Sequence, residues 1–235
     1  MKILFSALAL VLGGAAVAQQ PGQPSLKIEP TNRTLALSAT DGVSVEPEVA
    51  ILHIGFETAP TDAKSAYAAG SRKSNAIMDA LKQAGVEESD IRSVSQYLSP
   101  DYTYPKQHRY TLTQQWTVRC TPARAAELLD IAIDAGATSS GEIDWTVKDE
   151  KALADQALNR TTARLRESAE TLAHGMGVKL GVLLYTSNEV TSRFMPAPMT
   201  AQFAFKAKAD NTAPLAVAPQ KVSREATVYA VFTIE

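Results

Sequence analysis

Cysteine is nearly absent from this chain of 235 residues, which contains a single thiol, Cys120. One cysteine can form no internal disulfide, so a packed core has to supply the stability. Cys120 ends a segment in which alternate residues are mostly aromatic or apolar, namely Tyr110, Leu112, Trp116 and Val118. Because this two-residue period places them on one face of a strand, we predict that Cys120 is buried and unreactive. The less favoured alternatives are a redox sensor and a disulfide between chains.

A strong charge of one sign is also missing. The chain has 23 Lys and Arg residues against 25 Asp and Glu residues, and its pI is about 6.0. Binding to nucleic acid usually needs a basic surface and a high pI. We therefore expect no nucleic-acid partner.

The signatures of common catalytic and cofactor sites are absent from the sequence. It has no Gly-x-Ser-x-Gly elbow, phosphate loop or Gly-x-Gly-x-x-Gly. His53, His108 and His174 share no metal-ligand spacing. Glu142 and Asp144 share one side of a strand, where paired carboxylates can do acid–base chemistry, but a solvated strand face is the favoured interpretation. We predict no catalytic residue, no metal site and no cofactor.

A long apolar run occurs only at the N-terminus. Lys2 precedes the apolar residues 3–12, and Ala16-Val17-Ala18 forms a small-residue cleavage site. This pattern predicts a secretory signal peptide over residues 1–18, cleaved after Ala18. A membrane anchor is less favoured, because a spanning helix needs about 20 apolar residues. We expect export to the periplasm, a disordered leader over residues 19–32 and no transmembrane segment in the mature chain.

Three amphipathic helices are expected. The first covers residues 62–84, with Thr61 as N-cap and a stripe formed by Ala63, Ala66, Tyr67, Ile77, Leu81 and Ala84. The second begins at Thr121-Pro122 and ends at Gly136. Its apolar residues are Ala125, Leu128, Leu129, Ala132 and Ile133.

The longest helix is opened by Asp149 or Glu150 and closed by Gly175 or Gly177. Its stripe consists of Leu153, Ala157, Leu158, Leu165, Ala169, Leu172, Ala173 and Met176. Because the stripe is rich in alanine, we expect the partner of this helix to approach closely.

Strand periodicity occurs in residues 33–40, 49–57, 91–98, 110–120, 142–148, 180–190 and 221–234. A turn beginning at Asp41-Gly42 predicts that the first two strands pair as a hairpin. The second strand is apolar on both faces and should lie near the middle of a sheet. The order ββαββαβαββ predicts an α+β fold in which three helices cover mixed or antiparallel sheets, and residues 33–235 are expected to form one domain.

Three sequence segments, taken in their order along the chain, resemble those of a known protein family. They are ALKQAGVEESDIRSVSQYLSPDYTY at 80–104, ELLDIAIDAGA at 127–137 and ALADQALNRTTARLRESAETLAHGMGVKLG at 152–181. Over residues 35–235 the chain resembles the SIMPL-domain family of exported bacterial proteins, which includes periplasmic immunogenic proteins. The resemblance implies a SIMPL-like fold and a periplasmic or envelope location without an assigned catalytic activity. It also implies ring- or channel-like homo-oligomers in some members and a link with tolerance of oxidative stress.

Two groups of side chains are candidates for contacts with a subunit or a ligand. Aromatic and basic residues gather around residues 102–109, with tyrosines at Tyr97, Tyr102, Tyr104 and Tyr110. Arg160 and Arg164 lie one helical turn apart and could meet an anion or the carboxylate of another subunit. Packing of a hairpin tip and a solvated helix face remain the respective alternatives.

Residues 191–220 are rich in Pro, Ala and Met and lack a clean period, which predicts a long mobile loop. Three phenylalanines in this segment could contact an apolar ligand or a partner, namely Phe194, Phe203 and Phe205.

The leading functional hypothesis is a non-enzymatic envelope protein that self-associates and contributes to stress tolerance. The second is a periplasmic binding module for an apolar ligand or an envelope partner. The third is an unrecognised hydrolase, which would need a pocket joining groups that are distant in the sequence.

Overall fold

The computed structural model describes residues 33–102, 109–192 and 215–235. The predicted signal peptide and leader, and most of the predicted loop at 191–220, lie outside these residues. Residues 34–235 form one compact unit.

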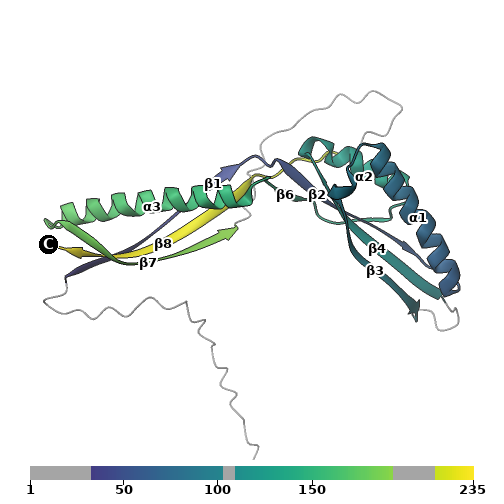
Figure 1. Cartoon of the computed structure of the whole chain (residues 1–235), viewed down its shortest axis with the longest axis horizontal. Coiled ribbons are helices and arrows are strands. Elements are labelled where there is room, and N and C mark those ends of the chain that lie inside the picture. The colour runs from purple at the N-terminus through teal and green to yellow at the C-terminus, as the bar shows by residue number, and fades with distance from the viewer. Residues whose placement is uncertain (1–32, 103–108, 193–214) are drawn as a thin grey trace, which may run out of the picture. The chain divides into compact units, whose positions relative to one another are not determined.

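The described chain alternates pairs of strands with single helices (Figure 1). The three helices are α1 (Ala63–Gln83), α2 (Ala125–Asp134) and α3 (Glu150–Gly175). The longer strands are β1 (Thr34–Val45), β2 (Val49–Thr58), β3 (Ile91–Asp101), β4 (Arg109–Cys120), β7 (Leu180–Ser192) and β8 (Val222–Ile234). Two short strands, β5 (Ser139–Ser140) and β6 (Asp144–Thr146), lie between α2 and α3. The predicted α+β class with three helices is confirmed, and every strand pair is antiparallel.

One sheet has the strand order β1-β8-β7 and carries α3 on one face (Figure 1). Leu165 and Ala169 of α3 pack against alternate residues of β8 and β1, namely Val228, Ala230, Phe232, Leu35, Leu37 and Ala39. Asp149 caps α3, because its Oδ1 accepts a hydrogen bond of 2.8 Å from the Ala152 N–H. Gly177 follows the helix with a φ of 71°, as the predicted glycine stop requires.

The other sheet has the order β3-β4-β2-β5, with β6 also paired to β2. Helices α1 and α2 supply Ile77, Leu81 and Leu128 to a core that includes Leu52, Phe56, Trp116 and Val118 of the sheet. These sheet residues occupy even-numbered positions, so the odd-numbered side chains of β2 point to the face without helices. The prediction that β2 is a central strand is confirmed.

The predicted hairpin between the first two strands is wrong. β1 pairs with β8 from Thr34↔Thr233 to Val45↔Val222, whereas β2 pairs with β4. Asp41 and Gly42 do not begin a turn but lie within β1. A Cβ on Gly42 would lie 2.9 Å from the Arg224 carbonyl oxygen, so glycine at this position permits the close approach of β8.

Several boundaries also differ from the sequence-based expectation. Asp62, not Thr61, caps α1, since its Oδ1 accepts from the Ser65 N–H at 2.9 Å. β3 runs through Pro100, which an edge strand tolerates. The strand expected at 142–148 is reduced to β6, and β7 extends to Ser192, within the expected loop.

Four residues of the predicted apolar stripes are exposed, namely Tyr67, Ile133, Leu172 and Met176. The buried residues of α3 follow a row spaced by four, namely Leu153, Ala157, Thr161, Leu165, Ala169 and Ala173. Such a row is inclined to the helix axis, and Leu172 and Met176 lie beside it. Thr161 fits the row because its hydroxyl bonds to the Ala157 carbonyl at 2.8 Å.

Candidate functional site

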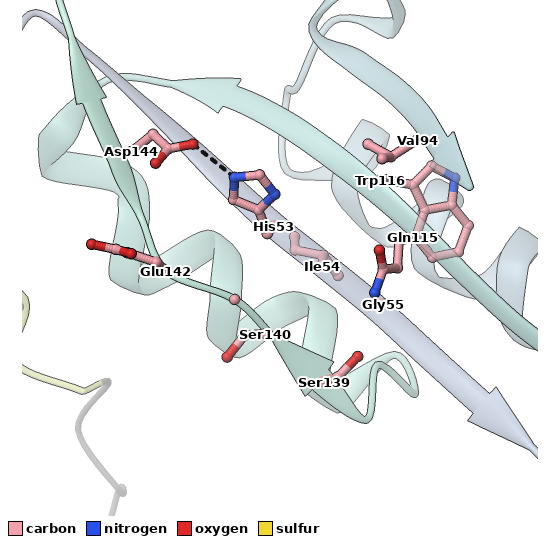
Figure 2. Close-up of a pocket in the computed structure, with 11 residues that line it drawn as sticks. His53, Ile54, Gly55, Val94, Gln115, Trp116, Ser139, Ser140, Glu142 and Asp144 are labelled. Atoms are coloured by element: carbon pink, nitrogen blue, oxygen red, sulfur yellow. Dashed lines mark hydrogen bonds and ion pairs between the residues drawn. The ribbon is translucent and has the colours of Figure 1, made fainter. Parts of the chain in front are cut away.

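A cavity of about 490 Å³ lies beside β2 in the five-stranded sheet (Figure 2). Its lining residues come from β2, β3, β4, β5 and the segment leading into β6, namely His53, Ile54, Gly55, Val94, Gln115, Trp116, Ser139, Ser140, Gly141, Glu142 and Asp144. Since His53, Gly55 and Gln115 occupy odd-numbered positions, they open onto the face of the sheet that carries no helix.

An imidazole–carboxylate pair forms one end of the cavity. Nε2 of His53 lies 2.8 Å from Oδ2 of Asp144, and both side chains are about half exposed. The pair is brought together by antiparallel pairing of β6 with β2, in which Asp144 lies opposite Ile51. The bond fixes the orientation of the ring and leaves Nδ1 of His53 for another partner.

The hydroxyl-bearing strand β5 forms another side of the cavity. The Gly141 N–H donates to the His53 carbonyl at 3.0 Å and holds this segment against β2. A Cβ on Gly141 would lie 2.9 Å from Cβ of His53, so the segment can approach only because residue 141 is glycine. Among the described residues, no side-chain hydrogen bond engages the hydroxyl of Ser139 or Ser140.

This geometry bears on the hydrolase hypothesis. A serine nucleophile needs its base within hydrogen-bond reach, and the base needs an orienting group. His53 and Asp144 supply a base and its orienting group, but no hydrogen bond joins either neighbouring serine to His53. The cavity therefore brings together groups that are distant in the sequence without assembling a nucleophile–base pair.

Sequence analysis missed the contact between His53 and Asp144. It expected Glu142 and Asp144 to lie on a solvated strand face, and both are exposed. It could not assign β6 to β2, because periodicity identifies the face of a strand and not its partner. The available signal was a histidine within an otherwise apolar strand, together with a strand carrying alternate carboxylates.

The candidate tyrosines do not form one surface. Tyr97 on β3 is 67% exposed and Tyr102 is 82% exposed. Tyr110 is half-buried and packs against the core of the five-stranded sheet, so it belongs to the fold. Tyr104 lies outside the described residues, as do Phe194, Phe203 and Phe205.

The two candidate arginines have a carboxylate within their own chain. Nε of Arg160 lies 2.9 Å from Oδ2 of Asp41, and a guanidinium nitrogen of Arg164 lies 4.0 Å from the same oxygen. A hydrogen bond from the Gly42 N–H, together with Arg160, lowers the pKa of Asp41 below its ordinary value. These contacts join α3 to β1, while both arginine side chains remain exposed.

Among the described residues, no group of three or more His, Cys, Asp or Glu side chains is arranged to hold a metal ion. None of the helices in the described ranges combines the length and the hydropathy needed to cross a bilayer.

Cys120 is partly buried beside the core of the five-stranded sheet, and this burial raises the pKa of its thiol to about 11. The reactive form is the thiolate, which is scarce at pH 8 when the pKa is raised. We expect iodoacetamide at pH 8 to modify Cys120 about 100-fold more slowly in the folded chain than in urea. Mass spectrometry of timed samples measures both rates, and equal rates would contradict the assignment of Cys120 as an inert core thiol.

Comparison with known proteins identifies related sequences. A family model described as "SIMPL: Protein of unknown function (DUF541)" matches residues 35–232. The chain is 27% identical to a 26 kDa periplasmic immunogenic protein of Brucella melitensis over 214 residues, which cover 86% of this chain and 84% of the relative. It is also 27% identical to an uncharacterized protein, YggE, from Edwardsiella ictaluri, with 90% of each chain covered. The YggE protein of Escherichia coli K12 is 27% identical, covering 85% of this chain and 80% of the relative.

Proposed function

The chain belongs to the SIMPL family, and we propose that it is a non-enzymatic periplasmic protein that self-associates through strand β7. The periplasmic location is supported by the name of the Brucella relatives, and by the apolar N-terminal run followed by the small residues Ala16-Val17-Ala18. A non-enzymatic role is consistent with relatives that carry no catalytic description.

The observation that carries the proposal is the exposed edge of β7. This strand has 13 residues and pairs only with β8 among the described strands. Every residue from Val182 to Ser192 is exposed, including five large apolar side chains: Val182, Leu183, Leu184, Tyr185 and Val190. Such an edge presents unpaired backbone N–H and C=O groups beside apolar surface, which favours pairing with another strand.

The composition of β7 supports a second copy of the chain as its partner. Proteins usually protect an edge strand with lysine, proline or inward-pointing charges. β7 contains no Lys, Arg or Pro, and its only charged residue is Glu189. Two copies can therefore pair along this edge with little like-charge repulsion. Leu172 and Met176 add exposed apolar surface at the end of α3, on the segment that leads into β7.

The edge of the other sheet is better protected. β3 also exposes apolar side chains, namely Val94, Tyr97 and Leu98. It contains Arg92, Pro100 and Asp101, whereas β7 has no proline and carries Glu189 as its only charged residue. Both strands have bulges in their pairing, so bulges do not distinguish them. Prolines and charges limit pairing at an edge, and their presence in β3 favours β7 as the contact between copies.

The proposal is tested by introducing two lysines into strand β7. The mature chain, residues 19–235, is expected to have a mass in solution that is a multiple of the monomer mass. The double substitution Val182→Lys and Leu184→Lys should shift this mass to that of the monomer, because two charges on the edge would be desolvated in the interface. Light scattering after size exclusion measures the change at equal protein concentration.

The matched control carries two lysines at exposed alanines elsewhere, Ala76→Lys on α1 and Ala163→Lys on α3. It adds the same charge and should keep the wild-type mass. A wild-type monomer, or a charged β7 that assembles like the control, would contradict self-association through this edge.

We also propose a role in tolerance of oxidative stress, which acts through the envelope assembly and not through thiol chemistry. Cys120 is the only cysteine of the sequence, and burial raises its pKa to about 11. A redox-sensing cysteine needs an accessible thiolate.

A further inference from the structure

We propose that the cavity beside β2 is a binding site for an uncharged saccharide. This inference does not depend on self-association, because the lining residues belong to the five-stranded sheet and β7 belongs to the other sheet.

Several polar groups that line the cavity have no hydrogen-bond partner among the described side chains. Ser139 pairs with Gly55 and therefore shares the face of His53 and Gln115, and its hydroxyl has no hydrogen bond to a described side chain. Oε1 of Gln115 accepts from Ser95 at 3.5 Å, which leaves the amide N–H groups of Gln115 free to donate. Nδ1 of His53 is also open, since Nε2 is bonded to Asp144. The cavity thus offers both donors and acceptors, and a ligand hydroxyl can bond to either kind.

The charge of the lining residues also restricts the ligand. The lining residues include two carboxylates, Glu142 and Asp144, and no Lys or Arg. A phosphate or carboxylate ligand would meet no Lys or Arg side chain in this lining, and it would be repelled by both acids. These charges make an anion an unfavourable ligand, so the candidates are uncharged or cationic molecules.

The positions of the two carboxylates favour an uncharged ligand over a cationic one. Figure 2 shows the bond from His53 to Asp144, whereas the Glu142 side chain projects away from His53. The two carboxylates therefore do not converge on one point where an ammonium group could bind both. The remaining polar groups are hydroxyl, amide and imidazole, which match an uncharged polyhydroxylated molecule.

The apolar part of the site suits the face of a sugar ring. Val94 is 57% exposed at the bulge of β3, while Ile54 and Trp116 are almost fully buried. Tyr97 lies on the same strand face as Ser95, since Tyr97 pairs with Thr113 and Ser95 with Gln115. Its exposed ring is therefore placed next to the cavity, where it can stack on the C–H face of a pyranose.

The backbone holds these groups rigidly. Gly55 accepts from the Thr138 N–H at 2.9 Å, and His53 accepts from the Gly141 N–H at 3.0 Å. Sites on hydrogen-bonded strands keep their side chains in a defined geometry, which lowers the entropy lost when a ligand binds.

The test titrates the mature chain with three sugar trimers in a calorimeter. Cellotriose and the trimer of N-acetylglucosamine are uncharged, whereas the glucosamine trimer carries ammonium groups. We expect at least one uncharged trimer to bind with a Kd near ~1 mM or below. The double variant Gln115→Ala and Ser139→Ala should weaken this binding about tenfold, because two hydrogen bonds to the ligand are lost.

The control variant Gln96→Ala removes a glutamine side chain from β3 that does not line the cavity, and it should bind like the wild type. A second readout is the fluorescence of Trp116, which is the only tryptophan when Trp145→Phe is introduced. Saturable binding that the double variant weakens supports the site. Absence of binding at ~10 mM, equal binding by the double variant, or binding of the glucosamine trimer alone would overturn the proposal.

Discussion

Replacing Phe56 with alanine is expected to lower the free energy of unfolding by about 3–5 kcal/mol, the largest effect of any single substitution considered. Phe56 is 2% exposed and is among the largest fully buried side chains. Its ring centroid lies 5.7 Å from that of Trp116, and the two rings are tilted against each other. The distance is within the range in which aromatic pairs stabilise a fold. Truncation would leave a cavity in the middle of the core formed by the sheet and α1.

The cavity could not be filled easily by the neighbours of Phe56. A Cβ on Gly70 would overlap Cδ2 of Leu112 and lie 3.5 Å from Cε2 of Phe56, so these three residues are already closely packed. Protein cores relax only partly around a truncated side chain. The loss therefore includes the burial free energy of the removed ring and an added cost for the cavity that remains. Lys73 also places its ammonium 6.0 Å from the ring centroid, a cation–π contact that the substitution removes.

Urea unfolding followed by circular dichroism measures this effect, with all variants at one protein concentration because association would add to stability. Tyr97→Ala is the control, since it removes an aromatic ring that is 67% exposed from the same sheet. Its free energy of unfolding should stay within about 0.5 kcal/mol of the wild type. An equal loss in both variants would show that Phe56 does not anchor the core.

The sequence was sufficient to predict the elements whose signals are local. Asp149 and Gly177 mark the ends of α3, and both have the predicted cap and backbone conformation. The apolar residues on both faces of β2 predicted a central strand, and β2 lies between β4 and the short strands. These features depend on neighbouring residues alone, so they can be recognised without knowledge of the fold.

The features that were missed depend on contacts between distant segments. β1 has the same alternation whether it pairs with β2 or with β8, so the two pairings cannot be distinguished by pattern. The choice of β8 matches Leu35, Leu37 and Ala39 with the apolar face that α3 covers. A two-residue strand such as β5 has no measurable period, and the contact of His53 with Asp144 requires β6 to be placed on β2.

The candidate site was harder to predict for the same reason. Sequence reasoning selected residues by type, and it therefore chose exposed tyrosines and arginines that the structure places in separate regions. Tyr97 lies on β3 in the five-stranded sheet, while Arg160 bonds to Asp41 on β1. The cavity forms where β2, β3, β4, β5 and β6 come together, and apart from His53 in its apolar strand its residues have no distinctive local sequence context.

Enlarging Ala169 to leucine is expected to lower the free energy of unfolding by about 1–3 kcal/mol. Ala169 is fully buried between α3 and the sheet, in a row that also contains Ala157 and Ala173. Small residues in this row permit the helix to lie close to β8 and β1. A larger side chain would force α3 away from the sheet or push its neighbours into strained rotamers.

The control Ala163→Leu introduces the same side chain on the exposed side of the same helix. Alanine and leucine have similar helix propensities, so this variant should stay within about 0.5 kcal/mol of the wild type. Thermal and urea unfolding of both variants, at one protein concentration, distinguish the effect of packing against the sheet from the effect of helix propensity. If Ala169→Leu is as stable as Ala163→Leu, the space between α3 and the sheet is not filled, and the alanine row does not set their separation.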